Sequence, residues 1–175
     1  MTAHWQNPEL ITDGIIAYIT AAQAAKIAAV SAAYTDHPLP MVPFAEIHLS
    51  DPFKDVVNDW PALFVMPVDD EQEPNVSGLA GGYWALHRFE FAVLIGFAAD
   101  VSMTAAETAR RYGMRYLGAL EEMLVQSYDA TLRPWEWGVG ETPRRAYGAV
   151  ISFDSGEWLH DCRLTITCRA KEVAL

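Results

Sequence analysis

The chain has 175 residues, of which 51% are hydrophobic, including six Trp, seven Tyr and seven Phe, and this composition excludes intrinsic disorder. The length suits one packed domain, which we expect to span residues 1–175. Twelve Lys and Arg against 23 Asp and Glu give a formal net charge of −11. High-affinity binding to a phosphate backbone is therefore disfavoured.

A long helix is expected at the N-terminus. Asn7, Pro8 and Glu9 form a typical helix start, with an N-cap residue, a proline at the first helical position and an acid near the positive end of the dipole. His37-Pro38 is expected to end it, because a residue before proline is disfavoured in the helical region. Its second half is rich in alanine. This surface could lie on a sheet, or part of it could meet another subunit.

The same segment was weighed as a membrane span, because residues 14–35 contain one charged side chain, Lys26. Glu9 and Asp13 precede the run without any Lys or Arg, which is the opposite of a secretory signal. The run is also mostly alanine rather than leucine or phenylalanine. We therefore expect a packing helix and no membrane partner.

Two short strands are expected before the middle of the chain. Residues 45–49 alternate in polarity and predict either an edge strand or an ordered loop. Residues 61–67 form an apolar run bounded by prolines, which is typical of a buried strand. We expect that strand to pair with residues 83–96.

An acidic, glycine-rich excursion is predicted at residues 68–82, with a cluster formed by Asp69, Asp70, Glu71 and Glu73. The acids would repel phosphate, and they lack the regular spacing of a calcium loop. The segment is either a solvated loop or an arm that contacts a partner.

The strand expected at residues 83–96 is central to the predicted sheet. Phe89, Phe91, Val93 and Ile95 alternate with Arg88, Glu90, Ala92 and Leu94, so one face is fully apolar. An amphipathic helix from Ser102 to Ser127 is expected to cover that face.

Three arginines of the second helix, Arg110, Arg111 and Arg115, are predicted to lie mostly outside its inner face. They form either a solvated flank beside Glu107 or a contact for an acidic partner. Further along, Trp135 and Trp137 point the same way if the chain is extended. They could anchor a partner or be buried against the sheet edge.

The C-terminal part predicts a hairpin, with strands at residues 149–153 and 158–169 around a turn at 154–157. Cys162 and Cys168 alternate with core residues on the second strand and face inward. They would be about 20 Å apart at ~3.3 Å per residue, so they cannot form a disulfide.

No catalytic, cofactor-binding or metal-binding residue is predicted, because none of the five histidines has metal-ligand spacing and no nucleotide or nucleophile motif occurs. The best acid/base candidates are His87 beside Arg88 and His160 beside Asp161, which could approach each other if their strands pair. A cross-strand polar pair on a solvated face needs no catalytic function, and we favour that interpretation.

The order of these elements resembles the tail terminator, or tail completion, proteins of long-tailed bacteriophages and related gene transfer agents. The segments that carry the resemblance are PALFVMP, the acidic Gly-rich excursion, HRFEFAVLIG, TARRYGMRYLGALEEML and the final CRLTITCRAKE. The predicted fold is α+β, with a mixed, mostly antiparallel sheet of about four to five strands, a long N-terminal helix and a second helix packed on the sheet.

The resemblance implies a non-enzymatic virion protein, assembled in the bacterial host cytoplasm, that forms a ring of six at the tail and neck. Its partners would be other copies of itself, the tail tube protein and a head–tail connector protein, without cofactors. Six copies with a charge of −11 each would carry −66, so DNA would pass through the lumen without specific binding. Two alternatives stay open: another head–tail connector or adaptor, and a small-ligand-binding or enzymatic α+β domain.

Overall fold

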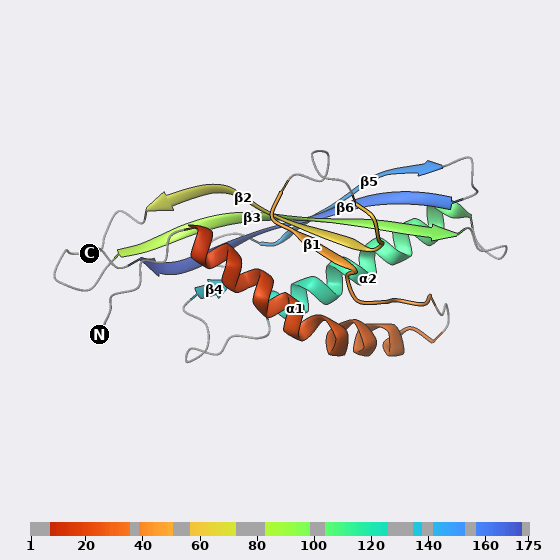
Figure 1. Ribbon diagram of the computed structural model, residues 1–175, viewed down its shortest axis with the longest axis horizontal. Coiled ribbons are helices and arrows are strands. Elements are labelled where there is room, and N and C mark those ends of the chain that lie inside the picture. The colour runs from red at the N-terminus through yellow and green to blue at the C-terminus, as the bar shows by residue number, and fades with distance from the viewer. Residues whose placement is uncertain are drawn as a thin grey trace.

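Two helices pack on one face of a mixed β-sheet (Figure 1). The computed structural model describes residues 8–35, 39–50, 57–72, 83–98, 104–125, 135–137, 142–152 and 157–172. In chain order the elements are α1 (Pro8–Ala33), β1 (Glu46–His48), β2 (Ala62–Gln72), β3 (Tyr83–Ala98), α2 (Ala105–Val125), β4 (Trp135–Trp137), β5 (Arg144–Ser152) and β6 (Glu157–Glu172). The predicted α+β class and its two helices are confirmed.

The strands lie in the order β1-β2-β3-β6, and β4 and β5 both pair with the remaining edge of β6. β4 lies opposite residues 168–170 of β6, and β5 lies opposite residues 158–165, so the sheet is at most five strands wide at any one level. The β1–β2 pair is parallel and all the others are antiparallel. The predicted pairing of β3 with β2 is confirmed, and β3 also pairs with β6 along its whole length.

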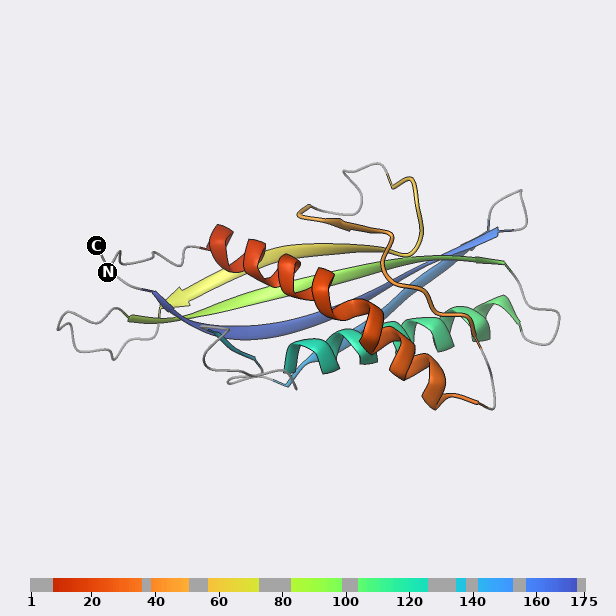
Figure 2. The same cartoon turned by 60° about the horizontal axis from the view of Figure 1, so that its bottom comes forward.

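The main core lies between the sheet and the two helices, as Figure 2 shows from a second direction. β3 buries Phe89, Phe91, Val93 and Ile95, the face that its alternation predicts. β6 buries its own alternate positions beside them, including both cysteines. The helices complete this core with Ile11, Ile15, Ile19 and Ile27 of α1 and Tyr116, Leu117, Leu120, Met123 and Leu124 of α2.

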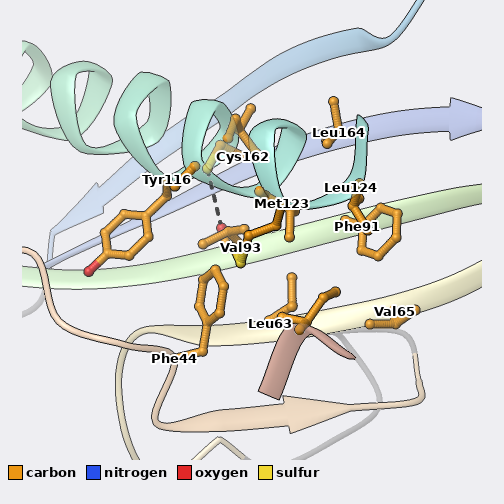
Figure 3. Packing of buried hydrophobic residues seen from close by; sticks show 14 of the residues in the cluster. Phe44, Leu63, Val65, Phe91, Val93, Tyr116, Met123, Leu124, Cys162 and Leu164 are labelled. Carbon is orange, nitrogen blue, oxygen red and sulfur yellow. Dashed lines mark hydrogen bonds between the residues drawn. The ribbon is translucent and has the colours of Figure 1, made fainter. Parts of the chain in front are cut away.

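Figure 3 shows how tightly this core closes around Cys162, whose Sγ lies 3.6 Å from the carbonyl oxygen of Val93. Each fully buried side chain of leucine or phenylalanine size contributes roughly 1.5–3 kcal/mol. Packing of amphipathic faces, rather than helix propensity, therefore holds the helices in place.

The opposite face of the sheet is only partly apolar. A small cluster of Ala62, Phe64, Ala92 and Leu94 is covered by residues between β1 and β2. There the His48 ring stacks on Phe64 with 4.8 Å between centroids, and Trp60 lies so close to Gly96 that a Cβ at that glycine would be 2.8 Å from the indole. Beyond this cluster the face is polar, and Arg163 bonds to Glu90 at 2.5 Å and to Asp161 at 3.2 Å.

Several element boundaries differ from those predicted. α2 begins after Thr104 rather than Ser102, because the Thr104 hydroxyl accepts a hydrogen bond from the Glu107 amide at 3.2 Å and caps the helix. α1 ends at Ala33, four residues before His37. β5 begins at Arg144 rather than at Ala149, and residues 45–49 contain an edge strand, β1.

Candidate interface surfaces

The first three acids of the predicted excursion belong to a strand, so the prediction of a loop across residues 68–82 is wrong at its start. β2 continues to Gln72, and Asp69, Asp70 and Glu71 pair with Arg88, His87 and Leu86 of β3. A bulge between Pro67 and Asp69 resets the register, which explains why a proline does not end the strand. Glu73 and the rest of the excursion, residues 73–82, lie outside the described residues.

The predicted basic group on α2 is divided by packing. Arg110 is exposed, and Arg111 forms an ion pair with Glu107 at 2.8 Å. Arg115 is only 4% exposed, so its predicted place outside the inner face is wrong. Position 115 faces α1, where its guanidinium lies 4.3 Å from the centroid of the Tyr34 ring. Desolvation there lowers the pKa of Arg115, although it remains charged at neutral pH.

A shallow groove of about 210 Å³ runs between the two helices above Arg115. Its walls are small or apolar, with Ala29, Val30, Ala33, Met114 and Gly118 beside Tyr34, and Glu122 closes one side. The groove adjoins the outer side of α1, where the alanines from Ala17 to Ala33 are mostly exposed. These residues give α1 an apolar face that neither the sheet nor α2 covers.

α1 meets the length and composition of a membrane-spanning helix between Ile11 and Ala33, with a mean hydropathy of 1.5. Its four buried isoleucines, however, are part of the main core. Spanning a bilayer would remove them from that core, so the packed position and a membrane position are mutually exclusive.

The two tryptophan positions lie on β4, at an edge of the sheet. Trp135 pairs with Ala170 and Trp137 with Cys168 of β6. The pairing register is all that can be placed, because the side chains of both tryptophans lie outside the described part of the chain. Their exposure therefore stays a prediction.

The proposed approach of His87 and His160 is wrong, although their strands do pair. His87 lies opposite Cys168, and His160 lies opposite Ile95, eight residues further along the strand. At ~3.3 Å per residue the two rings are about 26 Å apart. Both are core histidines, and His160 packs against Gly113 with its Nδ1 3.4 Å from the Ala149 carbonyl oxygen. Desolvation lowers the pKa of His160 and keeps it neutral at pH 7.

Across the described ranges, no group of three or more His, Cys, Asp or Glu side chains could hold a metal ion. Both thiols are inert, because burial raises the pKa of Cys162 and of Cys168.

The structure also shows that the predicted strand at residues 149–153 is the end of a longer, exposed edge strand, β5, whose first residues were not predicted. Nearly all of β5 is accessible, with Tyr147 37% and Ile151 53% exposed. Its first residue, Arg144, is exposed, whereas Arg145 bonds to Glu121 of α2 at 2.6 Å. The continuous run from Arg144 to Ser152 could have predicted a longer strand, but Gly148 divides it and obscures the pattern.

A polar hollow of about 250 Å³ opens beside the start of β5, on the sheet face opposite the helices. Arg88, Arg144, Thr142, Thr165 and Thr167 line it, together with Ile166. Two guanidinium groups and three hydroxyls are suited to receive a carboxylate. Such a concentration of positive charge is unusual on a chain with a net charge of −11.

A scan against protein-family models matches none of them, and a search of curated proteins finds no significant match. Any function must therefore be argued from the folded chain and from the pattern of its elements.

Proposed function

We propose that this chain is a structural, non-enzymatic subunit of a ring that terminates the tail tube of a phage-like particle and joins the tube to the head–neck connector. The observation that carries the proposal is the one-sided architecture. Both helices lie on the same face of the sheet, and long stretches of both sheet edges pair with no other described strand (Figure 1). Exposed strand edges are templates for pairing with another chain.

The apolar face of α1 supports the same conclusion. Contiguous apolar surface on a folded domain is typical of protein contacts. Subunits of a ring bury such surface against their neighbours, and obligate interfaces of this kind are large and hydrophobic. The element order described above adds the resemblance to tail terminators, which predicts six subunits.

Charge supports the proposed passage of DNA. A formal charge of −11 on each copy would give a ring that repels the phosphate backbone, so DNA could move through the lumen without being held. A connector or adaptor from the same particle would share this property, and binding experiments must separate the two. The enzymatic alternative depended on His87 and His160, and their separation leaves it without a described site.

The proposal is tested by native mass spectrometry and electron microscopy of the full chain, alone and with the tail tube protein of the same particle. We expect a closed ring, of six copies, that binds the end of the tube. Monomers alone under both conditions would contradict the proposal. Binding to the portal-side protein without binding to the tube would instead identify an adaptor.

A further inference from the structure

The two edges of the sheet differ in charge. At one edge, β5 begins with Arg144 and Arg145 and has no acidic residue along its nine positions. At the other edge, β1 pairs only with residues 62–64 of β2, and the remainder of β2, Val65–Gln72, pairs on one side only among the described strands. That part of β2 contains Asp69, Asp70 and Glu71. One edge is therefore basic and the other acidic.

The helix layer extends the basic side. Gly113 of α2 faces Tyr147 of β5, and the exposed Arg110 precedes Gly113 by three residues, about one helical turn. α1 instead packs on α2 and on β2, and it carries an exposed carboxylate at Asp13. The charge difference thus involves both layers of the molecule.

The strand directions at the two edges are also compatible. β5 is antiparallel to β6, β6 to β3, and β3 to β2, so β5 is antiparallel to β2. If one copy is moved sideways, its β5 arrives beside the β2 of the next copy in the antiparallel orientation. Such a pair can form a regular hydrogen-bonded ladder.

We propose that copies of this chain join head to tail, with the first residues of the β5 edge of one copy, Arg144–Tyr147, paired to Val65–Asp69 of β2 in the next, so that the sheet continues around the ring. This inference rests on the proposed function, because it names the contact between its subunits. The contact uses two different surfaces, and a heterologous contact of this type is the one that generates rings.

The register of the pair follows from the charges. Across the sheet, Arg144 pairs with Thr165, Thr165 with Glu90, and Glu90 with Met66, so Arg144 is level with Met66. Asp69 and Asp70 lie two and three pairing steps further along β2. A stagger of two steps, about 7 Å at ~3.3 Å per step, brings Asp69 opposite Arg144 and the polar hollow and keeps the helices of both copies on one side of the sheet, because a further one-residue slip would turn the side chains to the other face. Closed sheets require a stagger between strands.

Self-pairing of either edge is less favourable. Two β5 edges together would combine four arginines, and two β2 edges would combine six carboxylates, whereas the mixed pair brings opposite charges together. Charge complementarity thus selects a second copy in the head-to-tail orientation over a two-fold dimer.

The test places one thiol on each edge, in the variant Asp69→Cys with Arg144→Cys. The native Cys162 and Cys168 are fully buried and do not compete for a short bismaleimide cross-linker. We expect the double variant to give a ladder of covalent oligomers up to the full ring. Each single variant should stay uncross-linked, and an equal mixture of the two should stop at dimers.

Charge reversal gives an independent readout. Arg144→Glu or Asp69→Arg alone should raise the subunit concentration needed for assembly on the order of tenfold, because an attractive pair becomes repulsive. The two reversals in one chain should restore assembly, since each edge again meets its opposite. Asp59→Arg, an exposed change of the same charge, should leave assembly unaltered.

The two proposals fail in different ways. Rings seen by electron microscopy without a cross-linked ladder or charge rescue would overturn the edge pairing and leave the ring intact. Absence of any oligomer, alone or with the tube protein, would overturn both.

Discussion

The hydroxyl of Tyr116 should contribute measurably to the stability of this fold. Tyr116 lies on α2 and is fully buried, and its hydroxyl donates to the Val42 carbonyl oxygen at 2.9 Å and accepts from the Val42 amide at 3.1 Å. One side chain thus satisfies both backbone groups of a residue in the segment that connects α1 to β1. Tyr116→Phe removes both bonds while keeping the ring.

The expected loss in free energy of unfolding is about 1–2 kcal/mol. Two backbone groups lose their partners, each at roughly 1–3 kcal/mol when buried, but the partial exposure of Val42 lets water replace part of that loss. For a chain of this size the melting temperature should fall by about 2–8 °C. Tyr112→Phe is the matched control, because its hydroxyl contacts the Pro40 carbonyl oxygen at only 3.4 Å, and it should lose less than about 0.5 kcal/mol.

The pH dependence of stability provides a second measurement. Burial raises the pKa of Tyr116 to about 12, from 10 in the unfolded chain. The free energy of folding linked to the Tyr116 proton is therefore fully present below pH 10 and is lost as pH rises from 10 to 12. The loss amounts to about 1.4 kcal/mol at pH 11. Urea unfolding at fixed protein concentration, at pH 8 and pH 11, should show a smaller difference for Tyr116→Phe than for the parent. Equal stability of Tyr116→Phe and Tyr112→Phe at pH 8 would refute the reasoning.

Three other outcomes are expected. Cys162 and Cys168 should react with Ellman's reagent at pH 8 only after unfolding in urea, because burial raises both pKa values, and rapid reaction of the native protein would contradict this. Burial lowers the pKa of His160, so the buried neutral ring is compatible with the fold above pH 6.5 and the free energy of unfolding falls at lower pH. The urea midpoint should therefore drop less between pH 7.5 and 5.5 in His160→Gln than in the parent. Gly96→Ala should lower the free energy of unfolding by about 1–3 kcal/mol, because its Cβ would lie 2.8 Å from Trp60. Gly118→Ala, whose Cβ would have no atom within 4 Å, should raise the free energy of unfolding by up to about 1 kcal/mol, and thermal melts would measure both changes.

The elements with strong periodicity were predictable. β3 and β6 each bury one alternating face, and α2 buries one helical stripe, so the hydrophobic pattern alone determines which side chains face the core. Their pairing followed from the same faces. Strand ends depend instead on neighbours: β2 passes Pro67 because β3 continues beside it and a bulge absorbs the mismatch.

The candidate surfaces were less predictable, because exposure depends on what lies opposite. Arg115 reads as a solvated arginine from its chemistry, yet α1 packs beside it and the Tyr34 ring covers its guanidinium. His87 and His160 lie on paired strands, but only the register shows that they are far apart. Sequence periodicity predicts on which face of the sheet a side chain lies, but it does not predict which residue of the neighbouring strand lies opposite.

Head-to-tail pairing of the sheet would also fix how the ring wall is built. Every copy would carry its helices on the same side of a continuous sheet, because both helices lie on one face of the chain (Figure 2). The opposite side of the wall would present the polar face, where Arg163 is held by Glu90 and Asp161. That network holds two carboxylates for one guanidinium, so it stays net acidic and keeps its side chains ordered. The polar hollow with Arg88 and Arg144 opens on the same face, so this side of the wall would be polar with charges of both signs, while the apolar surface of α1 is left for protein contacts.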